Sequence, residues 1–150
     1  MAKIGIVGTT SWGTTLAVMM ARRGLDVHLW ARTPDEAAEL SHAGENIRFV
    51  PGVEFPPGLR VTASPGEAFG DADVVIIAVP SRSLRDNVRA VRDGLNGAAV
   101  VVSATKGLEL ESGKRMSQIL SEELPPSLRP SICALSGPNL AMEIAREKPS

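Results

Sequence analysis

A glycine-containing turn near the N-terminus is the first feature of the sequence that points to chemistry. Gly8 and Gly13 stand between a short apolar run and a helix-like segment. Their spacing matches the first and third glycines of G-x-G-x-x-G, the turn that presents helix N–H groups to a pyrophosphate. Thr10 replaces the middle glycine, so its Cβ would crowd the pyrophosphate or its hydroxyl would hydrogen-bond to it. This context predicts a dinucleotide-binding turn, and the alternative is an ordinary strand-to-helix turn.

The end of the second apolar run bears on the choice of cofactor. NAD-preferring domains place a carboxylate there, about 20 residues beyond the glycines, to accept a hydrogen bond from the ribose 2′-OH. Here the run ends Trp30-Ala31-Arg32-Thr33, without a carboxylate. Arg32 could pair with a 2′-phosphate or stack on adenine, and the alternative is a solvated arginine. We therefore expect NADPH to be favoured, with NADH as the second candidate.

Two further segments follow apolar runs, where parallel strands of an open α/β sheet bind their ligands. Lys106 follows the run that ends at Val102, and Ser136-Gly137-Pro138-Asn139 follows the last run. An ammonium at this edge could stabilise charge that develops on a carbonyl oxygen. Gly137 would let a ligand approach the backbone closely. The alternatives are a surface lysine and a plain turn.

Other residue types carry no chemistry at their spacing. His28 and His42 have no partners at the spacing of a metal site or a catalytic triad. Cys133 is the only cysteine, which excludes an internal disulfide, suits a reducing cytoplasm and predicts a small buried residue in a strand. We expect one group of charged side chains to form a solvated helix face. That group is Arg82, Arg85, Asp86, Arg89, Arg92 and Asp93.

Charge and hydropathy narrow the class of partner. The chain carries 16 basic and 17 acidic residues without a basic stripe, so nucleic acid is not expected as a partner. The apolar runs fall far short of the roughly 20 residues that span a bilayer, and no signal peptide is recognisable. We expect a cytoplasmic protein without membrane insertion.

Apolar runs and helix-like segments alternate along the chain, as βαβ units require. Strands are expected at residues 3–7, 27–30, 59–62, 74–79, 99–102 and 132–135. Helices are expected after Gly13 as far as Arg23, at 34–43, 83–95 and 113–123, and from near Asn139. Segments 46–58 and 124–130 are proline-rich and are expected to be loops. The fold class is therefore α/β, a Rossmann-like doubly wound, mostly parallel sheet with helices on both faces.

Five segments of the sequence resemble those of a known family. Residues 8–17 (GTTSWGTTLA) are similar to the G-x-G-S-W/Y-G-T-A-L-A signature of bacterial NAD(P)-dependent glycerol-3-phosphate dehydrogenases. The similarity continues, in the order of the family, through NIRFVPG, VPS, ATKGLE and LSGPNLAMEIA at residues 46–52, 79–81, 104–109 and 135–145. Thr10 and Thr15 depart from the Gly and Ala that are common in the family.

The resemblance implies a function and a domain organisation. Residues 1–150 would be the NAD(P)-binding domain, with the family's helical substrate domain absent from this chain. These enzymes interconvert dihydroxyacetone phosphate and sn-glycerol 3-phosphate for phospholipid synthesis, and a lysine of the helical domain would be the general acid. The alternatives are the NAD(P)-binding module of another two-domain dehydrogenase, of ketopantoate or sugar-nucleotide type, and a non-catalytic NAD(P) sensor. A homo-oligomer is left open.

The glycine turn and the resemblance together assign the site residues. The expected cofactor contacts are Gly8, Thr10, Ser11, Trp12, Gly13, Arg32, Lys106 and Ala141. The expected substrate contacts are Lys106, Gly137 and Asn139, the last at a position where the family usually has Thr or Ser. No metal ligand is expected.

Overall fold

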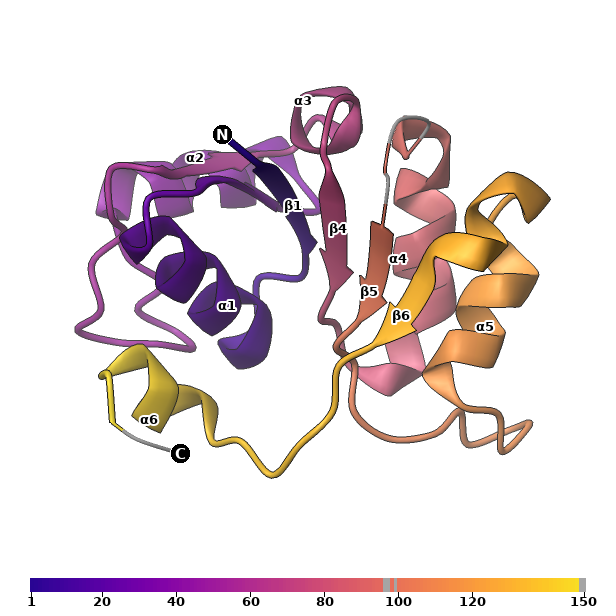
Figure 1. The fold of residues 1–150 in the computed structure, drawn as a ribbon. Coiled ribbons are helices and arrows are strands. Elements are labelled where there is room, and N and C mark those ends of the chain that lie inside the picture. Colours follow the sequence, from indigo (N-terminus) through magenta and orange to yellow (C-terminus); the bar gives the residue numbers. More distant parts are fainter. Residues whose placement is uncertain (96–97, 99, 149–150) are drawn as a thin grey trace.

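The computed structural model describes residues 1–95, 98 and 100–148. Six parallel strands form one sheet in the order β3-β2-β1-β4-β5-β6, with helices on both faces (Figure 1). The strands are β1 (Lys3–Val7), β2 (Asp26–Trp30), β3 (Leu59–Thr62), β4 (Val74–Ile77), β5 (Val100–Ser103) and β6 (Ile132–Ala134). This order is that of the doubly wound Rossmann fold, and it reverses direction between β1 and β4. The expected fold class is confirmed.

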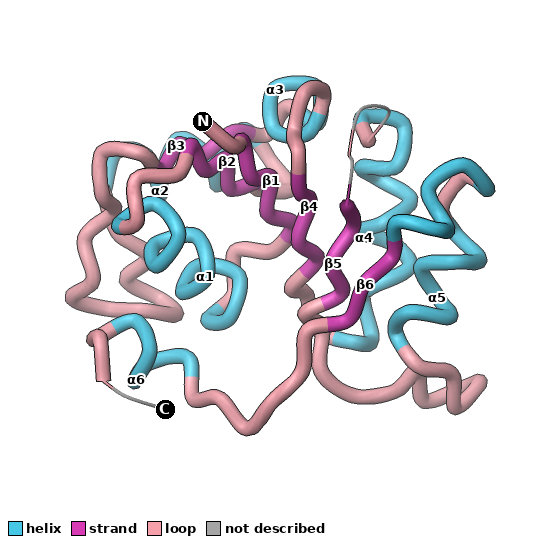
Figure 2. Tube along the Cα trace, in the orientation of Figure 1, coloured by secondary structure: helices cyan, strands magenta, loops and turns pink. Residues whose placement is uncertain are grey.

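Helices and short 3-10 turns connect the strands (Figure 2). The helices are α1 (Ser11–Arg22), α2 (Pro34–Ala43), α3 (Pro65–Phe69), α4 (Leu84–Val91), α5 (Met116–Glu123) and α6 (Ala141–Ala145). Figure 1 shows α1 and α6 on one side of the sheet, and α4 and α5 on the other. Among the described residues, no helix combines the length and the apolar content that crossing a membrane would require.

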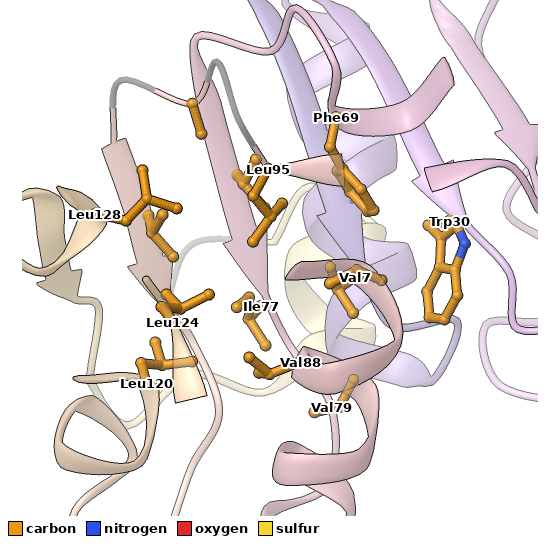
Figure 3. Close-up of a cluster of buried hydrophobic side chains, with 14 of the residues drawn as sticks. Val7, Trp30, Phe69, Ile77, Val79, Val88, Leu95, Leu120, Leu124 and Leu128 are labelled. Carbon is orange, nitrogen blue, oxygen red and sulfur yellow. The ribbon is translucent and has the colours of Figure 1, made fainter. Parts of the chain in front are cut away.

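Two hydrophobic cores hold these layers together. Successive side chains of a strand point to opposite faces of the sheet, so each inner strand contributes to both cores. Ile6 packs with Leu16 of α1, whereas its neighbour Val7 packs with Ile77 and with Val88 of α4 (Figure 3). The inner strands are therefore apolar on consecutive residues because helices cover both of their faces.

Several element boundaries differ from those expected. The β4 ladder ends at Ile77, and residue 99 of the expected fifth strand lies outside the described residues. Helix α3 was not expected, because five residues are too few to show a helical period, although Ser64-Pro65 repeats the Thr33-Pro34 start of α2. Helix α5 begins only at Met116, because the residues before it form a turn closed by a bridge between Leu108 and Arg115.

Two further expectations were incomplete or wrong. The expected helix 83–95 divides into α4 and a 3-10 turn at Arg92–Gly94, and the expected loop 124–130 contains a 3-10 helix, Pro126–Ser131. Cys133 is exposed rather than buried, because β6 is an edge strand and the described residues cover it poorly.

Two glycines allow α1 to start directly against the sheet. Gly8 has a φ of +127°, and a Cβ added to it would lie 2.3 Å from the carbonyl oxygen of Ala78. A Cβ added to Gly13 would lie 2.0 Å from the carbonyl oxygen of Gly8. Both contacts are with backbone atoms, which cannot move aside as a flexible side chain could. The first and third glycines are therefore needed for the close packing of the turn, the start of α1 and the end of β4.

We predict that Gly13→Ala destabilises the fold by about 1–3 kcal/mol or more, because the added methyl group would overlap a backbone oxygen. Gly66→Ala is the matched control, since its nearest neighbour would be the Ser64 hydroxyl at 3.8 Å. Alanine in a helix is favoured over glycine by about 1 kcal/mol, so Gly66→Ala should be neutral or stabilising. Urea denaturation of the three proteins measures both effects. Equal unfolding free energies for Gly13→Ala and the parent would contradict this packing.

Candidate cofactor site

The N-terminus of α1 is open toward solvent at the edge where β1 and β4 end. Thr10 is its N-cap residue, but its side chain makes no capping hydrogen bond. By contrast, the hydroxyls of Thr33 and Ser64 accept hydrogen bonds from backbone N–H groups of α2 and α3. The first N–H groups of a helix have no partner within the helix, so those of α1 are available to an anion. This fits a pyrophosphate and leaves both expected roles of the Thr10 side chain open.

The first cleft beside this helix end is lined by the glycine turn, the end of β2 and the start of α4. Its lining residues are Gly8, Thr9, Thr10, Trp30, Arg32, Val79, Pro80, Arg82, Ser83 and Asn87. It contains two arginines, Arg32 and Arg82, which are both exposed. Arg32 was expected here, whereas Arg82 was expected only on a solvated helix face. Two guanidinium groups beside an open helix N-terminus make this cleft attractive to phosphate groups.

The structure also brings a carboxylate to the end of β2. The Thr9 hydroxyl donates to Oε1 of Glu36 at 2.5 Å, and the backbone N–H of Arg32 donates to Oε2 at 3.1 Å. Glu36 lies in the first turn of α2, four residues beyond Arg32. No carboxylate stands at the end of β2 in the sequence, but the fold brings the Glu36 carboxylate there, so the expectation that this position lacks one was wrong. The signal for it was Thr33-Pro34, which starts a helix and so turns the chain back toward the strand end.

The second cleft lies on the other side of Thr10, between α1 and the ends of β4 and β5. It is lined by Thr10, Ser11, Trp12, Ala78, Val79, Pro80, Ala104, Thr105 and Lys106. The Nζ atom of Lys106 lies 5.3 Å from the centre of the Trp12 ring. It donates to the backbone oxygens of Asn139 at 3.0 Å and Gly137 at 3.4 Å. Five residues that the resemblance assigned to the site therefore meet here: Ser11, Trp12, Lys106, Gly137 and Asn139.

Ala141 stands apart from this group. It is the first residue of α6 and lines neither cleft. Its carbonyl oxygen accepts a hydrogen bond from the buried Thr15 hydroxyl at 3.3 Å, and Arg22 donates to the oxygen of Ala145 at 2.8 Å. Thr15, one of the departures from the family signature, therefore helps to hold α6 on α1.

Hydrogen bonds and ion pairs position the loop that carries Lys106. The Thr105 hydroxyl donates to the Ile77 oxygen and accepts from the Val79 N–H, both at 3.2 Å. Farther along, Arg85 donates from Nε to Oε1 of Glu109 at 2.5 Å and from a terminal nitrogen to Oε2 at 3.0 Å. Arg85 also pairs with Glu123 of α5, so it is not the solvated side chain that the sequence predicted.

The pairing of Glu109 is insensitive to ordinary changes of pH. Hydrogen bonds from Arg85, and then from Ser112, lower the pKa of the Glu109 carboxyl to about 2. Because the folded-state pKa is depressed, the pairing stabilises the fold above the ordinary carboxyl pKa. This contribution is lost only as the pH falls toward the folded-state value. The loop therefore stays anchored at neutral pH.

The NIRFVPG segment holds the glycine turn in place. Asn46 is 3% exposed, and its Nδ2 donates to the Thr9 oxygen at 2.6 Å and to the Thr14 hydroxyl at 2.9 Å. The Ser11 hydroxyl donates to the Phe49 oxygen at 3.4 Å. Sequence reasoning found this segment only as part of a family pattern, and the structure gives its physical role.

The remaining candidates have no part in either cleft. His28 is buried beside Asp26, with 3.3 Å between Nε2 and the carboxylate, and burial lowers its pKa below the ordinary value. It lines a separate hollow with Lys3 and Arg60. Within residues 1–95, 98 and 100–148 there is no group of three or more side chains suited to hold a metal ion.

Asn46→Asp should destabilise the fold by about 1–3 kcal/mol, because the buried carboxylate would have no N–H to donate to the half-buried Thr9 oxygen. Cofactor binding should weaken as well, since the turn loses its anchor. Thr14→Ala is the comparison, because it removes the second acceptor but leaves the bond to the Thr9 oxygen intact. Its loss should be smaller in both thermal unfolding and cofactor titration. An Asn46→Asp protein as stable as Thr14→Ala would refute the anchoring role.

Comparison with known proteins places this geometry in a family. Residues 3–150 match the family model for the N-terminus of NAD-dependent glycerol-3-phosphate dehydrogenase. The glycerol-3-phosphate dehydrogenase (NAD(P)+) of Dehalococcoides mccartyi is 47% identical over 100% of this chain, which covers 42% of that protein. The chain therefore spans less than half of the length of the curated relatives it matches.

Solved structures agree with this assignment. The crystal structure of glycerol-3-phosphate dehydrogenase from Coxiella burnetii has a TM-score of 0.86 and 28% identity, covering 99% of this chain and 45% of that one. A PanE/ApbA family ketopantoate reductase from Ralstonia eutropha has a TM-score of 0.63 and 21% identity, covering 88% of this chain and 39% of that one. The second similarity shows a common fold alone.

Proposed function

The chain belongs to the family of NAD-dependent glycerol-3-phosphate dehydrogenase N-terminal domains, and we propose that it is the nucleotide-binding domain of such an enzyme. The enzyme would reduce dihydroxyacetone phosphate to sn-glycerol 3-phosphate. The observation that carries the proposal is the position of Lys106. Its ammonium lies against Trp12 beside the open end of α1 and against the backbone of residues 137–139. Hydride for the C2 carbonyl of the substrate is the chemistry that the bound cofactor supplies.

Each part of the site has a separate task in this proposal. The N–H groups at the start of α1 bind the pyrophosphate, and Arg32 and Arg82 face the adenosine end of the cofactor. Lys106 has three N–H donors. Two point to the backbone oxygens of Gly137 and Asn139, and the third is left for the substrate oxygen. A positive charge there stabilises the negative charge that develops on that oxygen. The proton comes from a lysine of the family's helical domain, outside these residues.

Neither alternative function has a comparable observation behind it. The ketopantoate reductase shares the fold at 21% identity, so it offers no support for a common substrate. A sensor without turnover would not need the Lys106 ammonium to be held between the start of α1 and the backbone of residues 137–139.

We predict that NADPH binds about tenfold or more tightly than NADH, and that Arg32→Ala removes most of the difference. A charged hydrogen bond contributes about 1.5–3 kcal/mol, and about 1.4 kcal/mol corresponds to a tenfold change in affinity. Arg23→Ala, an exposed arginine at the far end of α1, is the control and should leave the ratio unchanged. Calorimetric titration with both cofactors is the measurement, and equal affinities in the parent protein would reject the preference.

Lys106→Ala should lower kcat/KM for dihydroxyacetone phosphate by roughly 100-fold, the scale for loss of one charge-stabilising donor. The assay requires a chain of the full length of the curated relatives, because the substrate must be enclosed. Cofactor affinity should change much less. Lys114→Ala is the matched control, since Lys114 pairs with Glu122 at the surface, away from both clefts. Near-normal turnover by Lys106→Ala would disprove its role.

A further inference from the structure

Glu36 is a carboxylate that the proposed function leaves unused; it does not itself line the first cleft, but it contacts two residues that do. Its two oxygens accept hydrogen bonds from two different segments, the Thr9 hydroxyl at 2.5 Å and the Arg32 N–H at 3.1 Å. Both donors belong to residues that line the cleft. The carboxylate therefore sits where the phosphate turn meets the end of β2.

The start of α2 fixes Glu36 in this place. Thr33 caps the helix by accepting a hydrogen bond from the Glu36 N–H at 3.1 Å, and Pro34 occupies its first turn. The Glu36 side chain then reaches back over the cap to Arg32, and it is half-buried. Glu39, three residues farther along the same helix, is exposed. Glu36 is thus held in one position, unlike an ordinary surface glutamate of this helix.

The chemistry of this position bears on the 2′ substituent of the adenosine ribose. A backbone N–H and a hydroxyl at a strand end are donors that a 2′-phosphate would need, and here a carboxylate already occupies them. A phosphate would also meet a like charge, which disfavours it. A carboxylate has about four acceptor sites. Two are in use, so Glu36 can still accept a hydrogen bond from a ribose hydroxyl.

We infer that Glu36 is a specificity-determining residue that restrains the preference for NADPH. It accepts a hydrogen bond from the ribose of NADH and opposes the 2′-phosphate of NADPH, against the attraction of Arg32 and Arg82. This inference rests on the proposed binding of a nicotinamide dinucleotide in the first cleft. It adds a second, opposing determinant to the arginines, and it predicts that the chain uses both cofactors.

A purely structural role for Glu36 makes a different prediction. If Glu36 only braced α2 against the glycine turn, its loss would weaken the binding of both cofactors equally. Glu36→Gln separates the two roles, because it keeps the size of the side chain and one acceptor oxygen but removes the charge. Glu36→Asp keeps the charge on a side chain shorter by one methylene. Glu39→Gln makes the same chemical change on the same helix, away from the cleft.

The experiment is calorimetric titration of the parent chain and the three variants with NADH and with NADPH, after thermal unfolding has shown that each variant is folded. Glu36→Gln should bind NADPH more tightly and NADH more weakly. The dissociation constant for NADH divided by that for NADPH should rise about tenfold, which corresponds to about 1.4 kcal/mol. Glu39→Gln and Glu36→Asp should stay close to the parent ratio. An unchanged ratio in Glu36→Gln, an equal loss for both cofactors, or the same shift in Glu36→Asp would overturn the inference.

The same titrations separate this inference from the proposed function. If the parent binds both cofactors and Arg32→Ala changes the ratio while Glu36→Gln does not, only the inference fails. If the parent binds neither cofactor, the proposed function fails and the inference fails with it.

Discussion

The contact between the Gly8 turn and the first turn of α1 is the constraint on which the rest of the site depends. The backbone of Gly8 lies so close to Ala78 and Gly13 that no side chain fits at either glycine. This closeness puts the start of α1 at the point where the sheet reverses direction, between β1 and β4. Both clefts are lined by Thr10 at this end of α1. A displacement of the helix by the width of a methyl group would therefore change the direction of its first N–H groups in both clefts.

Around this contact, polar groups from distant parts of the sequence fix the loops that carry the ligand-binding side chains. Asn46 reaches the turn from the loop after α2, and Thr105 joins the end of β4 to the loop after β5. Arg85 clamps the far end of that loop through Glu109. Each of these groups is at least partly buried, so each bond is protected from competition with water. The apolar cores position the strands and helices, and these bonds position the loops between them.

The architecture and the residues of the glycine turn could be predicted from the sequence, because both depend on local patterns. Apolar runs such as residues 3–7 and a helix start such as Thr33-Pro34 carry their signal within a few residues. The same helix start puts Glu36 in the first turn of α2, but it does not predict the contact of Glu36 with Thr9, which is 27 residues away. The pairing of Arg85 could not be predicted either, because Glu109 is 24 residues away. Cys133 was misplaced because an apolar strand does not reveal whether it lies inside the sheet or at its edge.

The position of β6 has a consequence for the behaviour of the chain in concentrated solution. This strand pairs with β5 on one side, and no other described strand pairs with it on the other. Its outer row of backbone N–H and C=O groups is a template onto which a strand of another molecule can add. The strand is three residues long and offers few such groups, so self-association through this edge should be weak, reversible and dependent on protein concentration.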